Sequence, residues 1–429
     1  MITRIEATRY RCFEQLDVEL SGFDVLVGAN GSGKTTLLDI PGLLGEMLRA
    51  RSVATPLLAS RDGSSPRAST LSELVFQGRG EWFILALEAN LPDRVIRDLL
   101  EGATDRVRRD EDRWPRTVRY EVRFEVFNNQ LDIKNEYLFV FSRTDEPKRS
   151  TPTKIAPRLH GEVARRRSWS FPLFREYGGE AEFRREVGRS NVRKATVSSA
   201  QLALPRVQFE SAQEYPAARW MHDLLVEDAV FLRPDWGAAR QASPPGLPDK
   251  LMSSAANIPW LALQVRQNDP HKWELFLQQV QIALPQVRDL DVVVRDDDRH
   301  AYFVVNYEGD FQVPTSGLSD GTLHILTLSL LPYLERPPRL LLVEEPENGI
   351  HPQAIEAVMQ GVSSMYDSQV VVTSHSPVVL ATTSLDQILV ARGSRSGAVE
   401  VIRGNAHPRL AEWKGELDLP MLFAAGVLG

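Results

Sequence analysis

The residues with the clearest chemical potential in this 429-residue chain form a glycine-rich loop between an apolar segment and a helical pattern. Gly28 to Thr35 reads GANGSGKT and fits GxxxxGK(S/T) at every fixed position. Glycines let several backbone N–H groups converge on phosphate oxygens at a helix N-terminus, whose dipole favours an anion. We therefore predict a nucleoside triphosphate site, in which Lys34 reaches the β- and γ-phosphates and the Thr35 hydroxyl binds Mg²⁺. The other nucleotide-binding residues that we predict are Asn30, Gly31, Ser32, Gly33 and Thr36.

Triphosphate hydrolysis also needs acidic groups, and a second segment supplies them. Four apolar residues, 340–343, predict a buried strand that ends in Glu344 and Glu345. Neighbouring side chains of a strand point to opposite faces, so the two glutamates cannot share one task. We assign Glu344 to Mg²⁺ and Glu345 to the attacking water. A further apolar strand, 369–373, leads to His375, for which we predict contact with the γ-phosphate.

The elements around these motifs predict an α/β protein. Apolar residues at helical spacing follow the loop up to about residue 50 and recur from 259 to 283. Residues 52–70 have the composition of a connection, and the many prolines between 147 and 248 exclude a long coiled-coil arm. The predicted strands, apart from the two above, are 2–10, 17–20, 23–27, 81–89, 119–127, 136–141, 291–294 and 301–308.

Composition limits the class of protein. With 48.2 kDa and 43% hydrophobic residues, the chain can form two or three domains with substantial cores. No stretch approaches the roughly 20 apolar residues that span a bilayer, and the N-terminus lacks a signal-peptide pattern, so we expect a cytoplasmic protein without a membrane partner. Cys12 is the single cysteine, which excludes an intrachain disulfide and a CxxC metal site.

Charge is unevenly distributed along the chain. Residues 143–194 contain 14 Lys and Arg against 7 Asp and Glu, while the whole chain has a net charge of −7. Two interpretations remain open, because such a stretch is either a solvated surface insertion or a docking site for nucleic-acid phosphates or another acidic partner.

Taken together, the motifs resemble those of ABC-type ATPases of the SMC, RecF and OLD group, especially the compact AAA_21-type proteins of bacterial defence loci. Residues 318–322, LSDGT, match the signature motif of that group. The segments VEEPENGIHP and TSHSP follow in the order found in the family. The resemblance implies an ABC-type P-loop ATPase head with a mixed sheet, an antiparallel β-lobe and an inserted basic, proline-containing subdomain. We expect boundaries at 1–144 and 251–429 for the two parts of the head, and at 145–250 for the insertion.

The resemblance also implies a composite site in a homodimer. Ser319, Asp320 and Gly321 would cap the γ-phosphate of ATP bound to the opposite subunit, and His375 would be the switch histidine. Asn348 and Gly349 fall where the family has its D-loop. Two residues depart from the usual motif, because Glu344 replaces aspartate and Asp320 replaces a common glycine. By the same resemblance, Arg11 would lie near the nucleotide, and Gln77 would be the Q-loop ligand of Mg²⁺.

For function, the resemblance implies an ATPase that controls nucleic-acid processing or a separate effector, such as a nuclease or toxin, in anti-phage defence. A RecF-like DNA-repair ATPase is the main alternative, and the ATPase subunit of a membrane transporter is less favoured. OLD proteins carry a nuclease domain after the ATPase. Because only 54 residues follow His375, we expect any nuclease to be another chain.

Overall fold

The computed structural model describes residues 1–59, 66–146, 169–177, 179–189, 191–209, 211, 213–394 and 396–408. The chain divides into two compact units, each assembled from separate segments. Unit 1 comprises Met1–Leu20, Asp39–Asp228 and Gly393–Val401, and unit 2 comprises Ser21–Leu38, Ala229–Arg392 and Ile402–Gly429.

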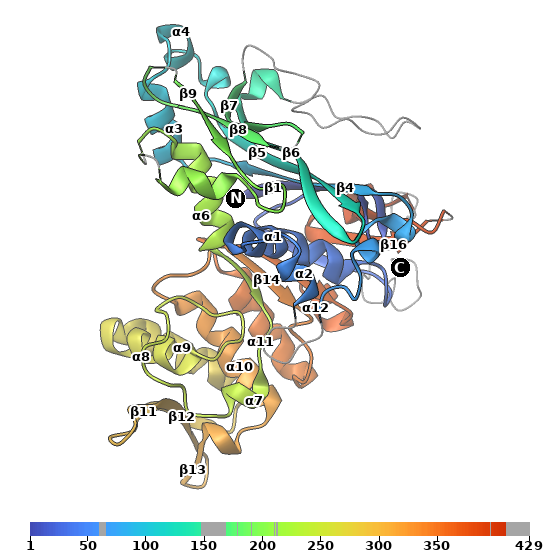
Figure 1. Cartoon of the computed structure of the whole chain (residues 1–429). Helices are drawn as coiled ribbons and strands as arrows, with labels where there is room; N and C mark the ends of the chain where they lie inside the picture. Colours follow the sequence, from blue (N-terminus) through green and yellow to red (C-terminus); the bar gives the residue numbers. More distant parts are fainter. Residues whose placement is uncertain are drawn as a thin grey trace. The chain divides into compact units, whose positions relative to one another are not determined.

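Unit 1 is built on an antiparallel sheet of eight strands in the order β2-β1-β4-β5-β6-β7-β8-β9 (Figure 1). β5 and β6 form a hairpin whose turn residues, Asn128 and Asn129, both have positive φ. Asparagine tolerates this conformation better than most residues, so it suits a tight hairpin turn. The strands are β1 (Ile2–Tyr10), β2 (Phe13–Glu19), β4 (Trp82–Asn90), β5 (Thr117–Phe127), β6 (Gln130–Phe141), β7 (Ser170–Arg175), β8 (Glu180–Arg184) and β9 (Val192–Thr196). The helices of this unit are α2 (Thr55–Leu58), α3 (Asp93–Glu101), α4 (Asp105–Arg108) and α6 (Pro216–Val226).

The predicted insertion at 145–250 is divided between the units. Strand β7 pairs with β6, so β7, β8 and β9 extend the sheet of unit 1, whereas residues 229–250 belong to unit 2. Residues 147–168, which contain much of the predicted basic stretch, lie outside the described part of the chain.

Unit 2 contains a six-stranded sheet in the order β10-β14-β15-β3-β16-β17, in which the pairs from β10 to β16 are parallel. One face of this sheet packs on α9, α10 and α11 to form an extensive apolar core. The strands are β3 (Phe23–Val27), β10 (Ala229–Leu232), β14 (Leu340–Glu344), β15 (Gln369–Ser374), β16 (Ile388–Gly393) and β17 (Val399–Arg403). The helices are α1 (Lys34–Arg49), which continues into unit 1, α7 (Trp236–Ala239), α8 (Ile258–Asn268), α9 (Pro270–Ala283), α10 (Asp320–Leu330), α11 (Pro352–Ser363) and α12 (Pro377–Ala381).

The helical pattern at 259–283 proves to be two helices. Asp269 separates α8 from α9 and caps α9 by accepting from the Lys272 backbone N–H at 3.1 Å. Pro270 restricts the preceding residue and cannot donate to α8, which explains the break. Both helices lie beside a small antiparallel sheet of β11 (Val287–Val294), β12 (Ala301–Tyr307) and β13 (Phe311–Pro314) (Figure 1). In the described residues, every helix is too short or too polar to cross a bilayer.

Candidate nucleotide site

The glycine-rich loop connects β3 to α1 within unit 2, as the sequence predicts. The Lys34 ammonium lies against this loop and donates to the carbonyls of Gly28 at 2.9 Å and Ala29 at 3.0 Å. Burial lowers the pKa of Lys34, and the carboxylates of segment 344–347 oppose that shift. Ser32 also lies in the loop, and its buried hydroxyl has no hydrogen-bond partner among the described residues. A buried polar group without a partner suits a site that receives a polar ligand.

Gly28 is required by a close approach at the start of the loop. A Cβ at this position would lie 2.2 Å from the Ala391 carbonyl oxygen and 2.6 Å from the Ser32 hydroxyl. Backbone at Ala391 cannot yield as a flexible side chain could, so any larger residue at 28 displaces the loop from β16.

The three parallel strands β14, β15 and β3 bring the acidic segment and the loop to one edge. Their register pairs Glu344 with Thr373, and Ser374 with Val27, so the carboxyl ends of the strands coincide. Ligands of open parallel sheets bind at this edge. The Thr35 hydroxyl donates to the Glu344 carboxylate across it.

Thr35 and Glu344 fit the predicted Mg²⁺ site by their chemistry. Both offer oxygen, which Mg²⁺ prefers, and Mg²⁺ in phosphate sites commonly takes one or two protein ligands plus phosphate oxygens. The pair is therefore suited to a metal delivered with a nucleotide.

Glu345 has different partners from Glu344. Its backbone has φ of 44°, a left-handed conformation that is unusual outside glycine and asparagine. Its carboxylate accepts from the Asn348 side-chain amide at 2.6 Å and lies 3.3 Å from His375 Nε2. Strained backbone often occurs at functional sites, where the surrounding contacts hold it. Glu345 and His375, predicted separately from the sequence, thus meet in one cluster.

Glu347 is a residue that we did not predict. Its Oε1 accepts from the Ser374 hydroxyl at 2.6 Å and from the His375 backbone N–H at 2.9 Å. These bonds tie the acidic segment to the end of β15 and fix the backbone at His375. The sequence shows Glu347 as the third acidic residue of EEPEN, but residue spacing could not reveal its contact with the end of β15.

The signature segment begins α10. Ser319 is the N-cap, and its hydroxyl accepts from the Thr322 backbone N–H at 3.2 Å. A Cβ on Gly321 would lie 2.2 Å from the Gly349 carbonyl oxygen. Gly321 is therefore demanded by contact with the predicted D-loop of its own chain, in addition to any role toward a ligand. The Asp320 carboxylate pairs with Arg240, whose contact the sequence did not reveal.

Arg11 and Gln77 belong to unit 1, and their predicted placement near the nucleotide stays a prediction. The Arg11 guanidinium donates to the Arg67 carbonyl at 2.6 Å. The Gln77 side-chain amide donates to the Ser396 carbonyl at 3.2 Å, and its backbone has φ of 53°. Asn30, Gly31, Gly33 and Thr36 lie in the loop and the first turn of α1, as predicted.

Comparison with known proteins agrees with this architecture. The model of the AAA_21 family, described as "AAA domain, putative AbiEii toxin, Type IV TA system", matches residues 24–381. A crystal structure of an SMC head bound to the C-winged helix domain of ScpA is 14% identical, with a TM-score of 0.52 over 94% of this chain and 97% of that one. An SMC head with an extended coiled coil, bound to a ScpA domain from Pyrococcus furiosus, is 13% identical, with a TM-score of 0.48 over 94% and 95%. No curated protein matches the chain. The predicted fold of an ABC-type ATPase head is confirmed.

Proposed function

Because the chain belongs to the AAA_21 family and has the fold of an SMC-type ATPase head, we propose that it binds ATP with Mg²⁺ and hydrolyses it to ADP and phosphate. The observation that carries this proposal is the meeting of three motifs, the glycine-rich loop, the acidic segment and the His375 segment, at one edge of the unit 2 sheet. Lys34, Thr35, Glu344, Glu345 and His375 all lie there.

Each side chain has a task that its surroundings support. The Lys34 ammonium donates to two neutral carbonyls, so it can turn to the β- and γ-phosphates without breaking a hydrogen bond to a carboxylate. Thr35 and Glu344 would hold Mg²⁺, which supplies neutralisation of phosphate charge when bound. Glu345 would accept the proton of the attacking water.

Asn348 and His375 would orient this base. The Asn348 amide binds one oxygen of the Glu345 carboxylate, and His375 faces the other. With both oxygens directed, the carboxylate would hold a water in line with the γ-phosphate, and His375 would contact the phosphate itself. Positioning and fixed dipoles account for most of the catalysis of phosphoryl transfer.

We further propose that two copies form two composite sites. The N-terminus of α10 in one subunit, with Ser319 as its cap, would face the γ-phosphate held by Lys34 of the other. A helix N-terminus favours an anion through its dipole and free N–H groups. ATP would then join the subunits, and hydrolysis would release them.

The proposed role of this cycle is control of a separate effector, a nuclease or toxin, in anti-phage defence. The family description names a toxin system, and the SMC head of similar fold has a partner domain bound to it. Purification of the tagged protein from its host, followed by identification of bound proteins, tests this role. A nuclease or toxin supports it, whereas recovery of DNA-repair proteins alone would replace it with a repair function.

Mixing two inactive variants tests the composite site. Lys34→Ala destroys the phosphate loop but keeps a sound signature, and Ser319→Arg does the reverse. A mixed dimer contains one intact site and one doubly broken site, so mixing should restore part of the ATPase activity. Mixed dimers are verified by two different tags. If they form, and a tandem dimer with one broken site is active, yet mixing restores nothing, then each site lies within one chain.

A further inference from the structure

The aspartate of the signature creates an electrostatic difficulty for the proposed composite site. Asp320 is the first residue of α10, and its side chain is 53% exposed. A carboxylate beside the helix N-terminus offsets the positive end of the helix dipole and repels a triphosphate. The inference that follows rests on the proposed function, because it concerns the surface that would meet ATP on the other subunit.

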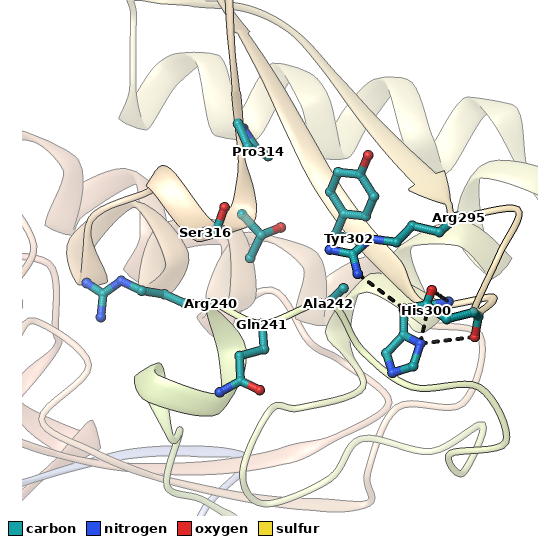
Figure 2. A pocket seen from close by; sticks show the side chains of 10 residues that line it. Arg240, Gln241, Ala242, Arg295, His300, Tyr302, Pro314 and Ser316 are labelled. Atoms are coloured by element: carbon teal, nitrogen blue, oxygen red, sulfur yellow. Dashed lines mark hydrogen bonds and ion pairs between the residues drawn. The ribbon is translucent and has the colours of Figure 1, made fainter.

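Arg240 lies where it removes this difficulty. One terminal nitrogen of its guanidinium is 2.6 Å from the Asp320 carboxylate, and its Nε donates to the Leu318 carbonyl at 3.2 Å. Arg240 therefore contacts the signature segment on both sides of Ser319. Figure 2 shows its guanidinium directed away from Arg295 and His300, with which it lines a cavity of about 540 Å³.

The backbone that carries Arg240 is itself anchored. Arg240 is the C-cap of α7, whose N-cap Asp235 accepts from the Ala238 backbone N–H at 3.0 Å. The Trp236 ring packs on the His324 ring of α10, with centroids 4.9 Å apart. Three residues further along the chain, Ser243 exchanges two backbone hydrogen bonds with Ala301 of β12.

His324 extends this connection to the predicted D-loop. Its Nδ1 lies 2.9 Å from the Asn348 carbonyl oxygen, and burial lowers the pKa of the His324 imidazole. α7 therefore contacts α10 at two points, one ionic and one aromatic, and the aromatic contact leads to the segment that orients Glu345. An arginine held in this way loses little conformational freedom when it pairs.

We propose that Arg240 is a positioning residue that neutralises Asp320 and holds the signature segment ready for the triphosphate of the opposite subunit. Arg240 touches neither nucleotide nor water in this role. In the common form of the motif, glycine leaves no negative charge at this helix N-terminus, and here the Arg240 guanidinium cancels the charge of Asp320 instead. The contacts of Arg240 with Leu318 and Asp320 also fix the segment between them.

The test first removes the neutralisation of Asp320 by Arg240 and then removes the charge of Asp320 itself. Arg240→Gln leaves Asp320 unpaired, so the ATP concentration for half-maximal turnover should rise about five- to tenfold with a smaller change in kcat. Adding Asp320→Asn removes the repelling charge and should return the value to within about twofold of the wild type. Arg240→Lys keeps the positive charge, so it should raise the ATP concentration for half-maximal turnover less than Arg240→Gln does. The deficit of Arg240→Gln should also shrink in high salt, which screens exposed charges.

Arg288→Gln is the matched control, because Arg288 is also exposed in unit 2 and pairs with an aspartate, Asp310, at 2.7 Å. It should leave turnover unchanged. Wild-type kinetics in Arg240→Gln, or a loss that Asp320→Asn does not repair in a protein of normal melting temperature, overturns the inference while the proposed function stands. A wild-type protein that neither hydrolyses ATP nor dimerises with it overturns both.

Discussion

The two units bury charge in opposite ways. In unit 1, Arg119 lies inside the sheet, and each of its nitrogens donates to a carboxylate: Nε to Glu121 at 2.7 Å, and the terminal nitrogens to Glu88 at 2.8 Å and Glu6 at 2.7 Å. In unit 2, the Lys34 ammonium is also buried, but it donates to two loop carbonyls. One cation is surrounded by countercharge, and the other is held by neutral acceptors.

This difference separates a structural charge from one directed at a ligand. Arg119 cannot move away without withdrawing its positive charge from the buried carboxylates of Glu88 and Glu121, whose surroundings do not solvate them. Lys34 can exchange carbonyls for phosphate oxygens at small cost, because carbonyl groups can be rehydrated or paired again. Burial alone therefore does not identify a functional charge, whereas the nature of its partners does.

The largest effect should follow from changing Lys34. Lys34→Ala should reduce ATP turnover at least about hundredfold, because a fixed charge aimed at developing phosphate charge is lost. The melting temperature should stay close to that of the wild type, since the lost bonds are to carbonyls of a loop. Glu345→Gln is the companion variant, because it should bind ATP normally and stop hydrolysis by removing only the base. Wild-type turnover in either variant would refute the assigned role.

A large effect on stability, with no change in ATP affinity, should follow from changing Arg119. Arg119→Met should lower the free energy of unfolding of unit 1 by about 3–5 kcal/mol, because Glu6, Glu88 and Glu121 lose their shared partner. Calorimetry measures the loss, and ATP affinity of the folded protein should not change. Adding Glu121→Gln should recover part of the stability. An unaltered melting curve for Arg119→Met would end the comparison drawn above.

A smaller and pH-dependent effect is expected at Glu186. Its Oε2 accepts from the backbone N–H groups of Ala217 and Ala218 at the start of α6, while its buried Oε1 has no partner among the described residues. Burial raises the pKa of Glu186 to about 8, and the two N–H groups only partly oppose this shift. The folded protein then binds a proton more tightly than the unfolded chain.

Stability should accordingly fall as pH rises from about 4.5 to about 8, by on the order of 1 kcal/mol per pH unit from this group. Below that window the group contributes no loss, and above it the loss is complete. Glu186→Gln cannot ionise, so its melting temperature relative to the wild type should increase with pH across the window. A difference that stays flat from pH 5 to pH 8 contradicts this assignment.

Local patterns predicted much of unit 2 and its site. The apolar strand before GANGSGKT, the strand ending in Glu344 and the strand before His375 are present, since each motif depends on residues adjacent in sequence. The meeting of these motifs follows from a parallel sheet. The φ of Glu345 and the partners of Glu347 depend on tertiary packing, which spacing does not encode.

Unit 1 was less predictable for a physical reason. Its strands bury charged residues such as Glu88 and Arg119. The alternation of polar and apolar residues along these strands therefore does not distinguish the solvent-exposed face from the buried face. Strand β6 begins at Gln130, six residues before the predicted strand, because Asn128 and Asn129 form a tight turn that starts β6 directly after β5. The contact of Arg240 with Asp320 joins residues 80 positions apart and has no local signature.

The smallest effect should come from Lys194, which lies in the same basic stretch as buried Arg175. The Lys194 ammonium is 3.4 Å from Glu180 and 3.5 Å from Glu182, and these carboxylates raise its pKa. Its side chain is 56% exposed, so water and salt screen the pairs, and Lys194→Ala should leave the melting temperature close to that of the wild type.

Arg175→Met provides the contrast within this stretch. The Arg175 guanidinium is fully buried and donates to the carbonyls of Val197, Ser198 and Gln201, so its removal leaves three acceptors and the nearby Glu136 without that partner. We expect this variant to lose several times more stability than Lys194→Ala in parallel thermal melts. Equal losses would mean that exposure and partner type do not distinguish the charges of unit 1, and the distinction between structural and ligand-directed charge would then lack support outside the nucleotide site.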